Sequence, residues 1–158
     1  LVATIYGKAF AAEMAAAVTL YYCGLGWDDA QMLTLCEALR AAHAGGALGK
    51  LESLGLGYNK MGDGAMAALA ALLGEGAMPN LKSLNLQGNQ ISDAGVTSLA
   101  SALRGGAMPS CKISMMIMLY GNPGSDDKGE GNDSKVKEAL ASPERAAALA
   151  RRQDELSA

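Results

Sequence analysis

The chain has 158 residues, of which 50% are apolar and 4% are aromatic. This length corresponds to about one domain, and the composition allows a continuous core of aliphatic side chains. The 13 basic and 16 acidic residues give a net charge of −3. That balance argues against the basic surface that nucleic-acid binding requires, so we expect no nucleic-acid partner.

The cysteines are spread along the chain, at Cys23, Cys36 and Cys111, and there is one histidine, His43. An odd number of separated cysteines is a poor disulfide framework and indicates a reducing, intracellular location, with the cytoplasm as the first expectation. A zinc site would need a Cys/His cluster, so no metal is expected. No run of about 20 apolar residues predicts a membrane span.

The first element in chain order is a helix expected over residues 8–16. We interpret residues 1–16 as an N-terminal cap or a partial repeat. The chain begins at Leu1 rather than at a methionine, which leaves open whether it is a fragment of a longer repeat protein.

An internal repeat is the strongest signal in the sequence. Residues 51–80 and 81–110 align without a gap and are identical at 13 of 30 positions. Residues 17–50 form a weaker copy with four additional residues in its connection, and residues 111–142 form a degenerate fourth copy. A period of this length is the signature of a solenoid, in which each unit buries its apolar faces against its neighbours.

Each unit combines two periodicities. Leu54 and Leu56 alternate with small residues, which predicts a short strand with one buried face. Met66, Leu69 and Leu73 follow at helical spacing, which predicts a helix with one apolar stripe. Gly-Ala-Met-Pro ends the helix in both central copies, so every unit is predicted to be a strand, a turn and a helix.

The pattern LxxLxLxxNxIxDxG followed by LxxAL resembles the leucine-rich repeat, in its ribonuclease-inhibitor-like subtype. The resemblance implies an α/β solenoid with parallel strands on a concave face and helices on a convex face. About four repeats are expected over residues 17–142, divided as 17–50, 51–80, 81–110 and 111–142. The first unit departs from the motif with Leu25 at the asparagine position, and the fourth has Gly124 at the isoleucine position.

Two columns of polar residues are interpreted as structural. Asn59, Asn89 and Asn122 follow successive strands, and we expect them to bind backbone groups of the turns rather than a ligand, because buried backbone groups need partners. Asp63 and Asp93 stand at the starts of the helices, where carboxylates act as N-caps. No nucleophile or base recurs beside them, so we predict no enzymatic activity.

The segment 125–135 is the densest acidic stretch. Its spacing does not match a calcium-binding EF-hand loop, because Lys128 or Gly129 falls at the third ligand position. We interpret the segment as a solvated, mobile loop and expect no cofactor. A helix is then expected over residues 134–140.

The C-terminal tail, residues 143–158, is predicted to be a charged, alanine-rich helix that begins with Pro143 after a Ser142 cap. Two placements stay open: the helix covers the open end of the solenoid, or it projects as a frayed tail. Its arginines Arg145, Arg151 and Arg152 are too few for a nucleic-acid patch, and its mixed charges do not favour a membrane.

The outward side chains of the strands form the surface that the core leaves free. We predict that it binds a protein partner, with tyrosines as anchors and amides as hydrogen-bonding groups. The expected binding residues are Tyr21, Ser53, Ser83, Asn85, Gln87, Met118 and Tyr120.

The predicted function is a non-catalytic protein–protein interaction module. One alternative is a GTPase-activating repeat protein, which would be helped by an arginine near the nucleotide; Arg40 and Arg104 in the repeats sit at helix ends. Another is the sensor segment of a larger signalling or immune-type receptor. The sequence leaves the partner, the biological process and the oligomeric state open.

Overall fold

The structure, a computed structural model, describes residues 9–10, 12–112, 116–128 and 133–157. Strands and helices alternate along the chain and then give way to two consecutive helices. The elements are β1 (Thr19–Tyr21), α2 (Asp29–Ala44), β2 (Ser53–Gly55), α3 (Asp63–Gly74), β3 (Ser83–Asn85), α4 (Asp93–Arg104), β4 (Ile117–Met118), α5 (Ser134–Ala141) and α6 (Pro143–Ser157). Residues 9–10 and 12–16 are also helical, within the N-terminal helix predicted from the sequence.

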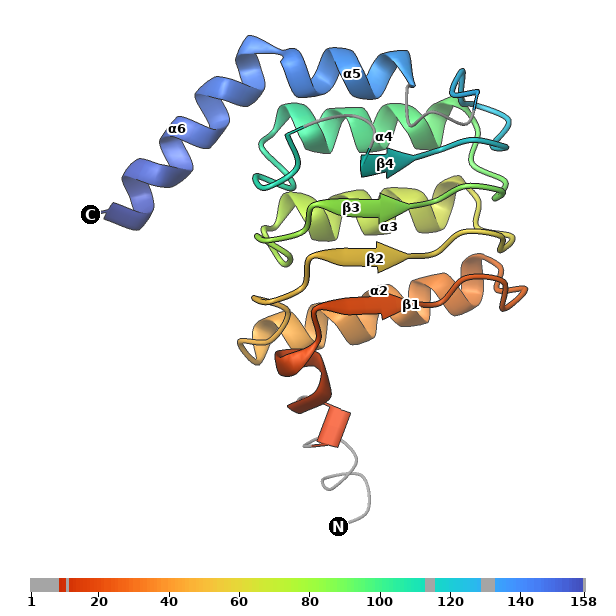
Figure 1. The fold of residues 1–158 in the computed structure, drawn as a ribbon, viewed down its shortest axis with the longest axis horizontal. Helices are drawn as coiled ribbons and strands as arrows, with labels where there is room; N and C mark the ends of the chain where they lie inside the picture. Colours follow the sequence, from red (N-terminus) through yellow and green to blue (C-terminus); the bar gives the residue numbers. More distant parts are fainter. Residues whose placement is uncertain (1–8, 11, 113–115, 129–132, 158) are drawn as a thin grey trace.

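The four strands form one parallel sheet in the order β1-β2-β3-β4. Its register pairs Leu20 with Leu54, Leu54 with Leu84, and Leu84 with Ile117. This is the pairing that the repeat alignment predicts. The strands are stacked like rungs, with the helices along one side of them (Figure 1). The predicted α/β solenoid is therefore confirmed.

The core lies between the sheet and the helices. The inward leucines of the strands and the predicted apolar stripes of α3 and α4 are buried. Cys36 of α2 takes the place that Ala70 occupies in α3 and is also buried. Burial raises the pKa of the Cys36 thiol to about 11, so this side chain stays neutral and packs as a small hydrophobic group.

An asparagine bridge joins each pair of neighbouring repeats. Asn89 Oδ1 accepts from Met61 N at 3.0 Å, and its Nδ2 donates to Leu56 O and Leu86 O at 3.0 and 2.9 Å. Asn59 and Asn122 make the corresponding bonds across their own boundaries. One side chain therefore satisfies backbone groups in two repeats at once, which a solenoid needs because its turns are stacked.

The prediction that Asp63 and Asp93 cap their own helices is wrong. The N-cap of α3 is Gly62, which has no capping side chain, and the N-cap of α4 is Ser92. Asp63 instead accepts hydrogen bonds from Ser92 N at 2.7 Å and Gly95 N at 3.1 Å, both at the start of the next helix. Asp93 is exposed and forms an ion pair with Lys135 of α5.

The same arrangement occurs one repeat earlier. Asp29, the first residue of α2, accepts from Gly62 N at 2.5 Å and from Ala65 N at 3.4 Å at the start of α3. The outer helices use their own caps. α2 has a capping box with Asp28 as N-cap, and α5 has Asp133 as N-cap. The start of each central helix is therefore bound by an aspartate of the preceding repeat, in α4 beside its own N-cap Ser92, whose hydroxyl accepts from Ala94 N at 3.3 Å. Helices α2 and α5 are capped locally.

Where the structure describes the acidic segment 125–135, it combines exposed and buried residues, so the interpretation as a solvated loop is wrong for the buried ones. Asp127 and Asp133 are buried. Asp133 accepts from Ser125 Oγ at 2.9 Å and Asp126 N at 3.2 Å, while Asp126 accepts from Ser134 N at 2.8 Å. The carboxylates bind the backbone of the turn that leads into α5. Residues 129–132 lie outside the described part of the chain.

Helix α6 lies against the edge of the solenoid where the repeat helices end, and its last turns point away from the body (Figure 1). Arg145 is buried and donates to four carbonyl oxygens at the end of α4 and in the following loop: Leu103, Ala107, Met108 and Cys111, at 2.6–3.2 Å. Two turns later, Arg152 donates to Gly74 O at the end of α3 at 2.6 Å. These cations bind the negative ends of two successive helices.

The predicted start of α6 is confirmed, because Ser142 Oγ accepts from Arg145 N at 3.2 Å and Pro143 is the first helical residue. Arg145 and Arg152, which the sequence analysis considered only as too few for a nucleic-acid patch, are structural groups in this position. Burial lowers the pKa of Arg145, and its four carbonyl partners compensate for the loss of water.

Candidate protein-binding surface

Seven residues predicted for partner binding lie on or at the rim of one side of the sheet, here called the strand face. They are Tyr21, Ser53, Ser83, Asn85, Gln87, Met118 and Tyr120. Tyr21 and Tyr120 are exposed, and the other five are half-buried. The register places Tyr21, Gly55, Asn85 and Met118 in one row across the four strands. The strand face has no charged side chain among these residues.

The centre of the strand face holds an oriented amide. Asn85 Oδ1 accepts from Gln87 N at 3.0 Å, which fixes the carboxamide against its own strand. Gly57 lies beside it, and a Cβ atom at Gly57 would stand 2.8 Å from Asn85 Oδ1. The glycine therefore leaves the space that the Asn85 side chain occupies.

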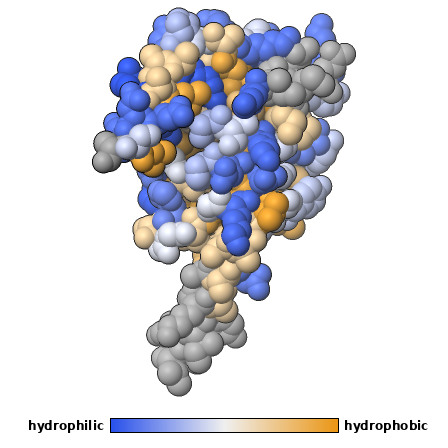
Figure 2. Space-filling model, turned by 60° about the vertical axis from the view of Figure 1, so that its left-hand side comes forward, coloured by the Kyte–Doolittle hydropathy of each residue, from blue (hydrophilic) through white to orange (hydrophobic). Residues whose placement is uncertain are grey.

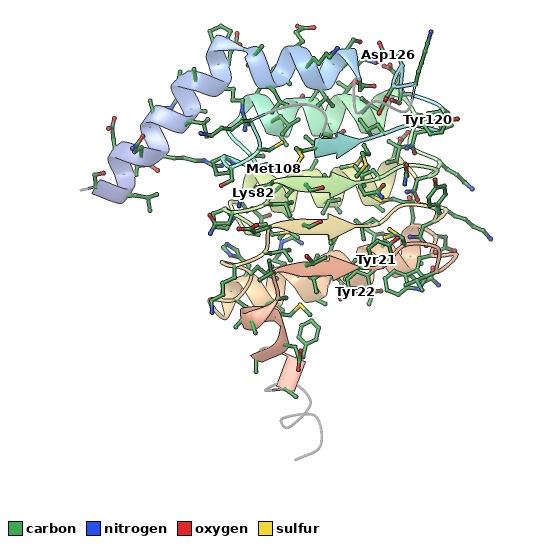
Figure 3. The ribbon with its side chains drawn as sticks, viewed as in Figure 1. Tyr21, Tyr22, Lys82, Met108, Tyr120 and Asp126 are labelled. Carbon is green, nitrogen blue, oxygen red and sulfur yellow. The ribbon has the colours of Figure 1, made fainter. Side chains whose placement is uncertain are left out.

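Tyrosines stand where the strands end. Tyr21 and Tyr120 both lie toward the carboxyl ends of the strands, on different repeats (Figure 3). Tyr21 is 72% exposed and Tyr120 is 51% exposed. The neighbouring Cys23 thiol raises the pKa of the Tyr21 hydroxyl, and nearby Tyr58 adds a smaller contribution in the same direction. A Cβ atom at Gly55 would stand 2.8 Å from Tyr21 Cδ2 and 3.1 Å from Cys23 Sγ, so these two side chains are close together at this edge.

Tyr58 belongs to this edge and was missed by the sequence reasoning, which assigned its segment to a tight turn. Its side chain is 61% exposed, and its backbone has a φ of 55°. The equivalent residues of the other repeats are Gly24, Gly88 and Gly121, with φ between 64° and 77°. The left-handed conformation costs a residue with a side chain about 1–2 kcal/mol. The sequence did contain a signal for Tyr58: the repeat alignment places this tyrosine at the position that is Gly88 in the next repeat.

A cleft of about 710 Å³ lies beneath α6, on another side of the molecule. It is lined by Pro79 and Pro109 of the loops that follow α3 and α4, and by Leu149, Arg152 and Leu156 of α6. Leu156 is 90% exposed. Hydrophobic residues reach the surface among hydrophilic ones on the side where α6 lies (Figure 2).

The arginines considered for a GTPase-activating role are in ion pairs between repeats. Arg40 binds Glu75 at 3.1 Å and Arg104 binds Glu138 at 3.4 Å, both at helix ends. In the part of the chain that the structure describes, no group of three or more His, Cys, Asp and Glu side chains could hold a metal ion. None of the described helices is both long and apolar enough to cross a membrane.

A leucine-rich-repeat family model matches residues 50–70 and 77–100, which contain the second and third strands with their helices. The repeat pattern, the parallel sheet and this match agree. The chain has the fold of a leucine-rich-repeat solenoid. No curated protein is similar to its sequence at a significant level.

Two solved structures show the same fold. One is leiomodin-1 actin-binding site 2 (ABS2), with a TM-score of 0.57 and 15% identity over 96% of this chain and 92% of that chain. The other is the C-terminal domain of a tropomodulin from Caenorhabditis elegans, with a TM-score of 0.51 and 14% identity over 96% of this chain and 95% of that chain. At sequence identities this low, the similarity between this chain and these two structures shows a shared fold and nothing more.

Proposed function

We propose that this solenoid is a non-catalytic module that binds a protein partner through the strand face. The observation that carries the proposal is the composition of that face: exposed tyrosines, the amides of Asn85 and Gln87, of which Asn85 is held by a hydrogen bond, and no charge among its seven residues, over a sheet whose other side is filled by the core. Tyrosines supply most of the binding energy in many protein interfaces, and amides supply directional hydrogen bonds.

The finer assignments belong to the same proposal. A 30-residue unit with a 12-residue helix in both central repeats supports the ribonuclease-inhibitor-like subtype. We divide the chain into an N-terminal cap (1–16), repeats (17–142) and a C-terminal helical tail (143–158). Cys23, Cys36 and Cys111, all in the described part of the chain, form no disulfide bond, which supports a reducing location such as the cytoplasm.

The test is a pull-down from a cell lysate with the wild-type chain and the double variant Asn85→Arg/Gln87→Glu. The matched control is Ala67→Arg/Thr97→Glu, which places the same charges on exposed positions of α3 and α4. Circular dichroism and melting check that all three are folded. A partner retained by the wild type and the control, and lost by the strand-face variant, supports the proposal. Equal capture by all three, or capture of nothing, contradicts it.

Purified actin is the first defined protein to include, because leiomodin-1 actin-binding site 2 has the same fold. Sedimentation with actin measures this binding directly. Binding that the strand-face variant loses would identify actin as a partner of this surface.

A further inference from the structure

The cleft beneath α6, here called the α6 cleft, is lined on one wall by a single stripe of that helix. Its α6 residues are Leu149, Arg152, Gln153 and Leu156. Their spacing of i, i+3, i+4 and i+7 is the spacing of one helix face. The two leucines are about 10.5 Å apart along the helix axis, with the arginine and the amide between them. A stripe of this kind is what a helix presents to a second helix packed along it.

A different face of α6 anchors the helix to the repeats. Arg145 and Ala148 are buried, and among the described elements α6 contacts α4 and α5. The last turns then point away from the body (Figure 1). Leu149 is half-buried and Leu156 is 90% exposed. The outer part of the stripe is therefore not covered by any described helix, and the cleft beside it has a volume of about 710 Å³.

The α6 cleft contains a cation that lacks an anionic partner. Arg152 Nη2 donates to Gly74 O at 2.6 Å, and Arg152 forms no ion pair with any described residue. Glu75 also lines the cleft, but Arg40 binds both of its carboxylate oxygens at 3.1 and 3.2 Å. Burial lowers the pKa of nearby Arg145, and the charge of Arg152 lowers it further. A carboxylate brought into the cleft would therefore meet a positive field.

The same charge argues against a second copy of this chain in the cleft. An α6 helix of another molecule, packed antiparallel along the stripe, would bring its own Arg152 and Gln153 against these two residues. The stripe carries no carboxylate to pair with the guanidinium. Like charges held together in this way oppose association. The occupant that complements the stripe has acidic residues where α6 has Arg152 and Gln153.

We propose that the α6 cleft binds an acidic amphipathic helix of a protein partner. Two apolar side chains seven residues apart pack on Leu149 and Leu156, and a carboxylate between them binds Arg152. This is the helix-in-groove mode of recognition, in which apolar anchors supply affinity and a charge supplies selectivity. The α6 cleft is then a second protein-binding surface, and it does not depend on the strand face.

The experiment is a fluorescence-anisotropy titration of the full chain with a labelled, alanine-based peptide of about 18 residues, which is long enough to be helical on its own. One face of the peptide carries leucines at i and i+7 and glutamates at i+3 and i+4. The comparison peptide has lysines in place of the glutamates. The wild-type chain should bind the glutamate peptide at least about tenfold more tightly than the lysine peptide.

Three variants locate the binding. Arg152→Gln keeps a hydrogen-bond donor near Gly74 O but removes the charge, and it should reduce the preference for the glutamate peptide about tenfold. Arg151→Gln is the matched control, because it makes the same substitution on the exposed side of α6, and it should keep the preference. Leu156→Ala should weaken binding of the glutamate peptide about tenfold. Its melting temperature should equal that of the wild type, so it tests the cleft even where Arg152→Gln loosens α6.

Four results overturn the inference: no binding of the glutamate peptide, equal binding of both peptides, full binding by Leu156→Ala, or equal effects of Arg151→Gln and Arg152→Gln. A wild-type dimer in sedimentation that Leu156→Ala dissociates would place a second copy in the cleft and also overturn it. The strand-face variant Asn85→Arg/Gln87→Glu should bind the glutamate peptide as the wild type does. Failure of this titration is therefore separate from failure of the proposed function, and loss of the peptide in that variant would assign it to the strand face instead.

Discussion

The carboxylate of Asp63 and the hydroxyl of Ser92 are 2.5 Å apart and join the first residue of α3 to the N-cap of α4. The same carboxylate accepts the backbone N–H groups of Ser92 and Gly95. One side chain thus binds the start of a helix whose N-cap, Ser92, lies 29 residues later in the chain. We therefore expect a substitution of Asp63 to weaken the packing between the second and third repeats.

Replacing Asp63 with alanine should lower the free energy of unfolding by about 2 kcal/mol, the upper end for loss of a helix cap, because two N–H groups and a hydroxyl lose their acceptor. Asp93→Ala is the matched control: it removes the aspartate at the same helical position, but that side chain is exposed and makes an ion pair worth about 0–1 kcal/mol. Urea denaturation measures both. Equal losses would refute the inter-repeat cap.

The stability should also depend on pH through Asp63. The Ser92 hydroxyl, with the N–H groups of Ser92 and Gly95, holds the pKa of Asp63 below its ordinary value of 3.8. The stabilisation is therefore present above pH 3.8 and is lost as the pH falls through the lower pKa of the folded state. The stability difference between wild type and Asp63→Asn should shrink over that range in urea titrations. A difference that stays constant would show that the charge is not involved.

Replacing Arg145 with methionine should destabilise the chain by about 3 kcal/mol, because the four carbonyl oxygens that it binds become unsatisfied in a buried place. Arg151→Met on the exposed side of α6 is the control and should change stability by less than about 0.5 kcal/mol. Guanidinium denaturation followed by circular dichroism compares them. If the two variants unfold alike, Arg145 does not hold α6 against the repeats.

Replacing Asn89 with alanine should cost about 2–3 kcal/mol, since backbone groups of two repeats lose the carboxamide. Asn85→Ala, four residues earlier and on the strand face, should leave stability within about 1 kcal/mol and act on partner binding instead. Thermal melting and the pull-down together separate these effects. A binding defect in a stable Asn89→Ala variant would contradict its structural role.

The repeat alignment predicted the register of the sheet and the buried stripes, because a solenoid repeats the same local environment in each unit. The inter-repeat caps could not be predicted in that way. The position of Asp63 near the next helix depends on how the units stack, and local sequence shows only that an aspartate stands near a helix start. Arg145 and Arg152 lie in a helix with a weak apolar stripe. The spacing of apolar residues therefore could not predict which side of this helix faces the repeats.

The candidate site was only partly predicted, and the physical reason differs from that for the caps. Alternation in the strands identifies outward residues, and it identified Tyr21, Asn85 and Tyr120. Tyr58 lies in the turn, where alternation has ended. Its significance depends on a backbone conformation that only comparison with Gly88 in the next repeat suggests.

The contacts of α6 impose an order on how this fold can form during synthesis. The asparagine bridges, the caps and the ion pairs join repeats that are neighbours in the chain, so each can form soon after the next repeat leaves the ribosome. Arg152 instead binds Gly74 O, which precedes it by 78 residues. The end of α3 therefore keeps a carbonyl without this partner until α6 has been synthesised, and a nascent chain that reaches only residue 148 would contain all four repeats but not this bond.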